Sequence, residues 1–411
     1  MDKQNLIIIT PDQMRADYLG CYGNQFIKTP NIDALAKQGT RFDAAYCSAP
    51  LCGPSRVSFV TGTYMGEHQH RNYGSTVDYH IPNLFSQLKK CGYKTSLFGK
   101  NHCFYYEQLS EAFDEYDEIC LGNYEGFDEY EHSYSAFTMP QEHHHNLTKR
   151  LTDEAMQFME KNKDSAFVTW ITYQDPHPAF TCPEPYASMY NPEDMQLPES
   201  YYFGPREDKP IRNYVWQKHS EMDTCTAYDA KKAMAYYCGQ ISYVDEQVGR
   251  IWDKVTQLGI ADNTIICFFA DHGEMLGDQG MFHKLPAFYE GMIRIPLIIY
   301  HPRQKNRLNI YSGLFEEIDL APTLLGMMNI AAPVTMKGID VTRKIEALDD
   351  TGRENVISEA GLHAKTCKTP GDKPLLAPFA PTSHGPGIML RDKEFKLCMY
   401  ADDHCELYDM K

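Results

Sequence analysis

Short, continuous hydrophobic runs alternate with amphipathic stretches over most of this chain. Such runs are typical of strands buried on both faces of a sheet, and they lie at residues 6–10, 93–98, 166–173, 264–270 and 295–300. The amphipathic stretches have helical spacing, and they lie at residues 29–36, 81–92, 147–162, 228–258 and 318–328. Strands that alternate with helices predict an α/β fold in which a large, mostly parallel sheet is sandwiched by helices.

The pattern changes after residue 335. Short strand-like runs at residues 355–359, 387–391 and 395–400 predict a small C-terminal α+β subdomain that carries a short antiparallel sheet. We therefore expect a main domain over residues 1–335 and a small subdomain over residues 336–411. Two further stretches, residues 104–140 and 178–222, have weak periodicity, and we interpret them as a long excursion and a loop or lid.

Charge and cysteine usage narrow the class of protein. The 411 residues carry a formal net charge of −17, which argues against binding to nucleic acid or along a long polyanion. No apolar run approaches the ~20 residues of a membrane span, so we expect no membrane partner. The N-terminus shows no basic flank or cleavage site, and the 13 cysteines form no C-x-x-C pair. These features predict free thiols and a cytoplasmic location, with a removed leader as the alternative.

Polar residues follow four of the predicted strands, and ligands in open α/β sheets bind beyond the carboxyl ends of strands. The four groups are Asp12-Gln13, Lys100 with His102, Asp175 with His177, and Asp271-His272. Two carboxylates, an amide oxygen and an imidazole suit Ca²⁺, Mg²⁺ or Mn²⁺, so Asp12, Gln13, Asp271 and His272 predict a metal site. The alternatives are a helix cap at Asp12 and a simple turn at Asp271-His272-Gly273.

Residues 51–62 predict a short helix with a cysteine at its mouth. Cys52 precedes Gly53-Pro54, and proline is well tolerated at a first helical position. Arg56 lies one turn further on the same face. A helix N-terminus and a cation both favour an anion, which indicates a reactive cysteine. The alternative is a buried structural cysteine with Arg56 on a solvated face.

The run Cys52-Gly53-Pro54-Ser55-Arg56, followed by Thr61-Gly62, resembles the modification motif of the type I sulfatases, formylglycine-dependent members of the alkaline-phosphatase-like superfamily. The resemblance implies that Cys52 is oxidised to formylglycine by a formylglycine-generating or anaerobic sulfatase-maturating enzyme. It also implies a divalent cation at the four predicted ligands, with calcium expected first and manganese or magnesium as alternatives. Gln13 and His272 occur in the related phosphonate monoester hydrolases as well.

Three further motifs extend the resemblance. Lys100 and His102 match a Gly-Lys-x-His motif, which implies that Lys100 binds sulfate and that His102 hydrogen-bonds the second hydroxyl of the nucleophile. This pair favours a sulfatase over a phosphonate hydrolase. His177 and Lys284 match motifs that imply contact with the sulfate and the leaving-group oxygen.

The resemblance thus implies a sulfatase that hydrolyses a small sulfate monoester, with a carbohydrate sulfate as the expected substrate. The alternatives are a phosphonate monoester or phosphodiester hydrolase, and a metal-binding pseudoenzyme whose Cys52 is never converted. We expect specificity to come from residues 104–145, 178–222 and 360–386, where histidines 143–145 and His384 are minor candidates for substrate contact. The family usually continues beyond a Leu-Tyr-Asp element like that at residues 407–409, so we expect that a C-terminal portion is missing.

Overall fold

The computed structural model describes residues 3–71, 76–119, 132–139, 146–304, 307–361, 385–401 and 404–411. Its centre is an eight-stranded sheet of order β11-β2-β10-β9-β1-β7-β4-β5. These strands are β1 (Asn5–Pro11), β2 (Thr40–Phe42), β4 (Lys94–Lys100), β5 (Glu115–Ile119), β7 (Phe167–Tyr173), β9 (Thr264–Phe269), β10 (Leu297–Tyr300) and β11 (Ile310–Tyr311). The five neighbours from β9 to β5 run parallel, whereas β10 is antiparallel to β9 and to β2. The predicted large, mostly parallel sheet is confirmed.

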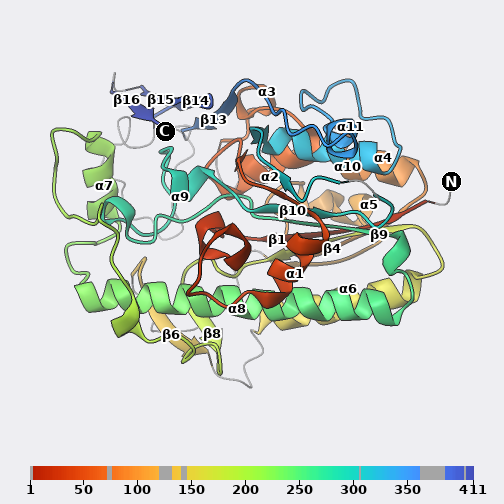
Figure 1. Ribbon diagram of the computed structural model, residues 1–411, viewed down its shortest axis with the longest axis horizontal. Coiled ribbons are helices and arrows are strands. Elements are labelled where there is room, and N and C mark those ends of the chain that lie inside the picture. Colours follow the sequence, from red (N-terminus) through yellow and green to blue (C-terminus); the bar gives the residue numbers. More distant parts are fainter. Residues whose placement is uncertain are drawn as a thin grey trace.

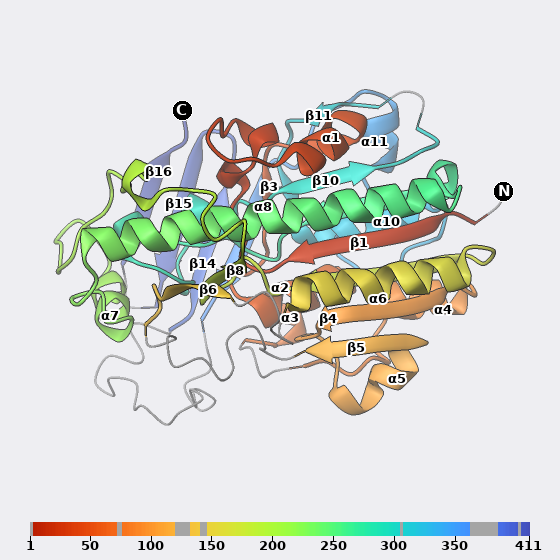
Figure 2. The ribbon, with the colours of Figure 1, turned by 90° about the horizontal axis from the view of Figure 1, so that it is seen from below.

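Helices cover both faces of this sheet (Figures 1 and 2). One face carries α1 (Pro30–Gln38), α6 (Leu147–Asn162) and α8 (Ala227–Gln257), and the other carries α2 (Cys52–Thr61), α4 (Leu84–Lys90) and α10 (Leu320–Met327). Within β1, Leu6 and Ile8 join the core on the α2 side, while Ile7 and Ile9 join the core on the α8 side. Because side chains alternate along a strand, a strand covered on both faces must be apolar at successive positions.

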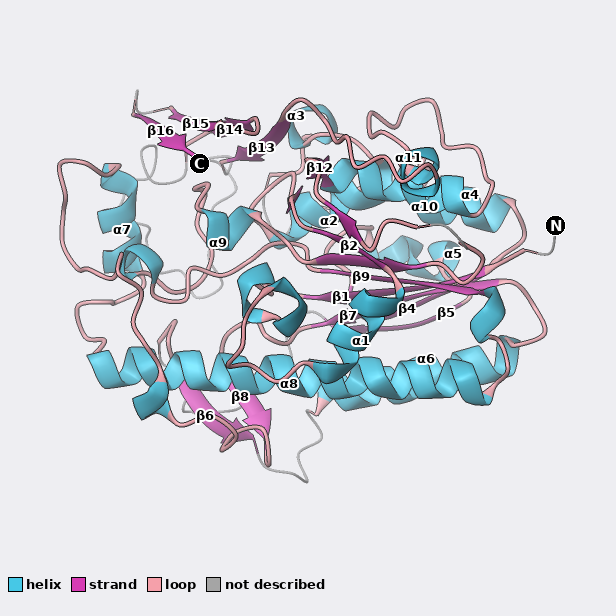
Figure 3. Cartoon of the chain, in the orientation of Figure 1, coloured by secondary structure: helices cyan, strands magenta, loops and turns pink. Residues whose placement is uncertain are grey.

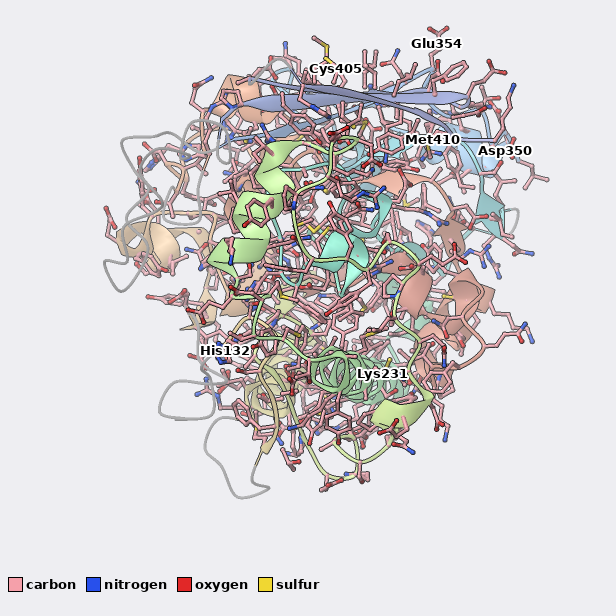
Figure 4. The ribbon with its side chains drawn as sticks, turned by 90° about the vertical axis from the view of Figure 1, so that its left-hand side faces the viewer. His132, Lys231, Asp350, Glu354, Cys405 and Met410 are labelled. Carbon is pink, nitrogen blue, oxygen red and sulfur yellow. The ribbon has the colours of Figure 1, made fainter. Side chains whose placement is uncertain are left out.

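A second, antiparallel sheet forms near the C-terminus (Figure 3). It contains β13 (Val356–Ala360), β14 (Gly387–Arg391), β15 (Phe395–Tyr400) and β16 (Cys405–Asp409), paired in chain order. Figure 4 shows its strands across the top of the molecule, with Cys405 on the outer side. Its inner residues Met389, Cys398 and Tyr400 pack into the core on the α2 side of the main sheet. The predicted antiparallel sheet is therefore confirmed, and the boundary at residue 335 stays a prediction.

Shorter elements complete the described chain. They are β3 (Ala45–Tyr46), α3 (Met65–His68), α5 (Leu109–Ala112), β6 (Ala136–Met139), β8 (Phe180–Pro183), α7 (Ile211–His219), α9 (Glu290–Ile293), β12 (Phe315–Glu316) and α11 (Thr342–Glu346). Among the described residues, no helix is both long enough and apolar enough to cross a membrane.

Two predicted irregular stretches contain regular structure. Residues 104–140 include β5, which pairs with β4 at the edge of the sheet, and residues 178–222 include β8 and α7. The interpretation of β5 as part of an excursion was wrong because edge strands often carry charged residues, and this one reads Glu-Tyr-Asp-Glu-Ile. Histidines 143–145 and His384 lie outside the described residues.

Candidate active site

Four adjacent strands deliver the predicted site residues to one edge of the sheet. The strands β9, β1, β7 and β4 are neighbours in that order, and all four are parallel. The groups Asp271-His272, Asp12-Gln13, Asp175 with His177, and Lys100 with His102 lie at or beyond their carboxyl ends. The sheet order therefore gathers residues that are distant in the sequence, such as Gln13 and Asp271, which are 258 positions apart.

A compact cluster of potential ligands lies at this edge. Donor atoms of Asp12, Cys52, Asp271 and His272 all lie within 4.8 Å of one another, and all four residues are buried. The Sγ atom of Cys52 is 3.2 Å from His272 Nε2 and 3.6 Å from Asp12 Oδ1. The Nδ1 atom of His272 lies 2.8 Å from the carbonyl of Gly273, to which it donates, so Nε2 faces the cluster. Two carboxylates and an imidazole nitrogen fit a divalent cation.

Gln13 contacts this cluster through its backbone, and its side-chain amide contacts Lys284 beside it. Its N–H donates to Asp271 Oδ1 at 3.1 Å, and its side-chain Oε1 accepts from Lys284 Nζ at 2.9 Å. Gln13 has a positive φ of 67°, an uncommon conformation for a residue with a side chain. The hydroxyl of Tyr237 stabilises it, because it donates to the Gln13 carbonyl and accepts from the N–H of Arg15.

Arg56 is fully buried and connects both carboxylates of the cluster. Its Nε donates to Asp271 at 2.9 Å, and its Nη2 donates to Asp12 at 3.3 Å. The Nζ atom of Lys100 lies 2.5 Å from Asp12 and 3.6 Å from Cys52. The alternative that placed Arg56 on a solvated face is wrong, because the helix face that bears it packs into the sheet edge.

His177, Lys284 and His102 border the cluster. Lys284 Nζ lies 2.7 Å from His177 Nε2, and His177 Nδ1 donates to the carbonyl of Pro178. His102 has a positive φ of 43°, and its buried Nδ1 has no hydrogen-bond partner among the described residues. The structure therefore pairs His177 with Lys284, whereas it gives His102 no bond to Cys52 within the described chain.

The buried cations of the site shift the pKa values of the neighbouring side chains. Burial raises the pKa of Asp12, but Lys100, Arg56 and Lys284 outweigh burial and hold it well below the usual range. Burial also raises the pKa of the Cys52 thiol, as does Asp12, but Lys100 and Lys284 bring it below its usual value. Burial, followed by Lys284, places the pKa of His177 well below its usual range. His177 is consequently neutral, and Lys284 donates the proton between them.

Cys52 lies at the mouth of α2, as expected, but the helix begins at Cys52 itself, two residues before Pro54, and it is closed by Gly62 with a φ of 63°. The first N–H groups of a helix have no partner within it, so this end attracts negative charge. Position 52 therefore lies between a helix N-terminus, two cations and the predicted ligands.

Two buried carboxylates near the site were not predicted. Glu274 accepts from the Gln13 amide, and Glu317 accepts from Ser55 Oγ at 2.6 Å and from Ser48 N at 3.0 Å. Ser55 Oγ also lies 2.7 Å from the carbonyl of Asp271, which ties α2 to the loop after β9. Glu274 directly follows Asp271-His272-Gly273, and this position was the available signal.

A pocket opens beside the cluster. It encloses about 360 Å³, including its open mouth, and Leu51 and Lys284 line the end nearest Cys52. Arg71, Trp216 and Glu359 supply a cation, an aromatic ring and a carboxylate to its wall. Trp216, Ala360 and Gly361 come from the stretches in which specificity was expected to reside, whereas Arg71 and Glu359 do not.

The large, mostly parallel sheet between two layers of helices is the fold of the alkaline-phosphatase-like superfamily. The sulfatase family profile matches residues 4–330, so the chain belongs to the sulfatase family. It is a sulfuric ester hydrolase.

Two sulfatase relatives agree with this assignment, and a phosphonate monoester hydrolase shares the fold. An arylsulfatase of Clostridium perfringens is 29% identical over 395 residues, which cover 87% of this chain and 81% of the relative. An N-acetylglucosamine-6-O-sulfatase of Bacteroides thetaiotaomicron is 24% identical over 468 aligned positions, which cover 100% of this chain and 81% of that protein. A phosphonate monoester hydrolase from Silicibacter pomeroyi superposes with a TM-score of 0.83 at 25% identity, over 99% of this chain and 89% of that one.

Proposed function

We propose that this protein hydrolyses the sulfate monoester of a small saccharide, with a formylglycine made from Cys52 and a divalent cation, calcium in the first place. The observation that carries the proposal is the position of Cys52. It begins α2, its Sγ lies 3.2–3.6 Å from His272, Asp12 and Lys100, and Arg56 ties Asp12 to Asp271. Asp12, Gln13, Asp271 and His272 would hold the cation.

The cations of the site would meet the charge of the sulfate group. Formylglycine supplies a hydrated aldehyde as nucleophile, and the divalent cation supplies Lewis-acid charge. Arg56, Lys100 and Lys284 lie around residue 52 in a buried site, where fixed charges act most strongly on a developing anion. Lys284 would hold the sulfate oxygens nearest the pocket.

Lys284 and His177 would deliver the proton to the leaving alcohol. Because Nδ1 of neutral His177 donates to Pro178, its Nε2 is an acceptor that holds Lys284 Nζ in place. Lys284 is thus the proton-bearing member of the pair. His102, whose burial and whose neighbours Lys100 and Arg56 set its pKa well below the usual range, is a neutral base that would accept the proton released when residue 52 sheds sulfate.

The adjacent pocket supports a saccharide as the alcohol. Trp216 offers a ring face against which the C–H face of a sugar can stack, and Glu359 and Arg71 can bind hydroxyl groups. The relative that acts at the 6-O position of N-acetylglucosamine supports the same class of substrate.

The test is sulfate release from a panel of mono- and disaccharide sulfates, measured by ion chromatography. Peptide mass spectrometry of the same sample would verify that Cys52 has been converted by a co-expressed maturating enzyme. We expect release from at least one saccharide and a loss of more than about 10³-fold in Cys52→Ala. Retained activity in that variant, or no release by converted protein, would refute the proposal.

A second candidate is hydrolysis of phosphonate monoesters or phosphodiesters. Gln13 and His272 favour it, as does the similarity in fold to the phosphonate monoester hydrolase. Comparing kcat/KM for a sulfate and a phosphodiester of the same phenol decides between the two. If Cys52 remains a thiol after co-expression with either maturating enzyme, the pseudoenzyme alternative holds instead.

A further inference from the structure

Glu274 lies behind the proposed cation site and is fully buried. Its Oε2 accepts a hydrogen bond from Nε2 of Gln13. Its Oε1 accepts from two backbone N–H groups, that of Leu276 at 3.0 Å and that of His283 at 2.5 Å. Both carboxylate oxygens of Glu274 are thus engaged.

The two ends of the Gln13 amide face chemically different partners. A lysine ammonium only donates, so the amide atom 2.9 Å from Lys284 must be the oxygen. Glu274, bound by two backbone donors on one oxygen, accepts on the other, so the amide atom beside it must be the nitrogen. The two partners together allow one amide orientation.

We propose that Glu274 is a positioning residue that fixes the Gln13 amide with its oxygen toward the cation. A divalent cation of this class binds oxygen, so the opposite orientation would present an N–H₂ group and repel it. The Glu274 carboxylate also accounts for glutamine rather than an acidic residue at position 13. A carboxylate at position 13 would place its negatively charged oxygen against that of Glu274. The inference rests on the cation site of the proposed function but needs no sulfatase activity.

The same carboxylate joins this ligand to the proton donor. The backbone groups bound to Glu274 lie at both ends of the loop from residue 275 to Lys284, where Met275 N also donates to the His283 carbonyl at 3.2 Å. Arg15 holds the start of this loop through the carbonyls of Glu274 and Met275. Glu274 therefore sets the positions of Gln13 and Lys284 together.

The experiment is a double-substitution cycle on the purified full chain, with Ca²⁺ affinity measured at about pH 8.5 by competition with a fluorescent chelator. In Glu274→Gln, the amide N–H₂ group introduced at position 274 faces the N–H₂ group of Gln13. We expect the Ca²⁺ affinity to fall about 10–100-fold, as is usual when a residue that orients a ligand is lost. In Gln13→Glu, an added carboxylate would ordinarily tighten binding, but opposite Glu274 we expect weaker binding. In the double variant, the amide introduced at position 274 donates to the carboxylate introduced at position 13, and we expect affinity within about threefold of the parent.

A matched control is Glu316→Gln, another buried glutamate that accepts a backbone N–H, on the far side of α2. It should leave Ca²⁺ affinity unchanged. Unchanged affinity in Glu274→Gln, tighter binding in Gln13→Glu, or no rescue in the double variant would each overturn the proposal. If Glu274→Gln does not fold, the direction of the change in Ca²⁺ affinity in Gln13→Glu still tests the proposal: weaker binding supports it and tighter binding overturns it. Because no readout is enzymatic, failure of the sulfatase assignment would be seen separately.

Discussion

The two sides of the active site are built in different ways. On the sheet side, the charged groups are fully buried and each has several partners, as Arg56 does with Asp12, Asp271 and the Lys100 carbonyl. On the pocket side, Arg71, Trp216 and Glu359 are half-buried and come from a loop, a short helix and the C-terminal sheet. The residues on the sheet side are fixed by the core of the fold. Those on the pocket side can be replaced without altering the buried charged groups.

The largest expected effect is on the sheet side. Arg56→Ala removes the shared arginine partner of two buried carboxylates, and loss of one partner of a buried ion pair typically costs about 3–5 kcal/mol of stability. It also removes a cation from the proposed sulfate site. We expect activity to fall below detection and the urea midpoint to fall clearly. As a control, Arg206→Ala breaks the exposed pair with Asp208 and should cost less than about 1 kcal/mol. Equal costs in the two variants would contradict the comparison.

A second effect concerns the junction with the C-terminal sheet. Glu316 accepts from Tyr64 at 2.7 Å and from Ile357 N of β13, and Arg353 lies 3.2 Å away. Burial raises the pKa of Glu316 to about 7 although Arg353 opposes the rise.

A raised acid pKa means that the folded state holds the proton more tightly than the unfolded state. The contribution of Glu316 to stability is therefore complete below pH 4.5 and is lost as the pH rises through 7, by about 3 kcal/mol in total. Urea unfolding between about pH 4.5 and 8 should show this decline in the parent protein and a shallower one in Glu316→Gln. If the free energy of unfolding changed with pH in the same way in both proteins, Glu316 would not be the cause of the decline.

A third effect tests how the C-terminal sheet supports the pocket. Lys396 of β15 donates to the carbonyl of Phe288 at 2.9 Å and to Glu290 at 3.0 Å, on the segment that follows Lys284. Lys396→Met leaves the buried carbonyl of Phe288 without this donor and removes one partner of Glu290, which we expect to cost about 1–3 kcal/mol. We also expect a higher KM with unchanged Ca²⁺ affinity. Lys411→Ala, which breaks an exposed pair with Glu394, is the control and should change neither. A loss of Ca²⁺ affinity in Lys396→Met would show that the two sides are not separate.

The smallest effect is expected in the pocket wall. Trp216→Ala should lower kcat/KM for a saccharide sulfate about tenfold, or roughly 1.4 kcal/mol, mainly through KM. Steady-state kinetics would measure this, with Trp252→Ala on the far part of α8 as a control for the loss of an indole. An unchanged KM would remove Trp216 from the proposed substrate contacts.

Hydrophobic periodicity in the sequence correctly predicted the strands that are apolar throughout and the helices that are clearly amphipathic. The helix over residues 147–162 and the strands at 387–391 and 395–400 have the predicted bounds. The edge strands β5 and β16 were missed because each has a face that needs no apolar cover.

The part of the candidate site that lies at the ends of predicted strands could be predicted from the sequence. Asp12, Lys100, His177 and Asp271 follow strands that the apolar runs predicted, and the parallel order brings them together. The position of Glu274 directly after Asp271-His272-Gly273 suggests that it lies near the site, but its contact with Gln13 depends on the tertiary fold. Its partner Gln13 lies 261 positions away, and no local period encodes that contact. The pocket residues Arg71 and Glu359 were missed for the same reason.

The topology also sets an order of events for Cys52. In the finished fold this thiol is only 1% exposed, so an enzyme that modifies it must act before the chain closes around it. Strand β1 lies between β7 and β9, so its last neighbour is not synthesised until residue 269. At roughly 5–20 residues per second, this leaves on the order of tens of seconds after Cys52 is made. The conversion of Cys52 that we propose would therefore have to take place within this interval, before β9 joins the sheet.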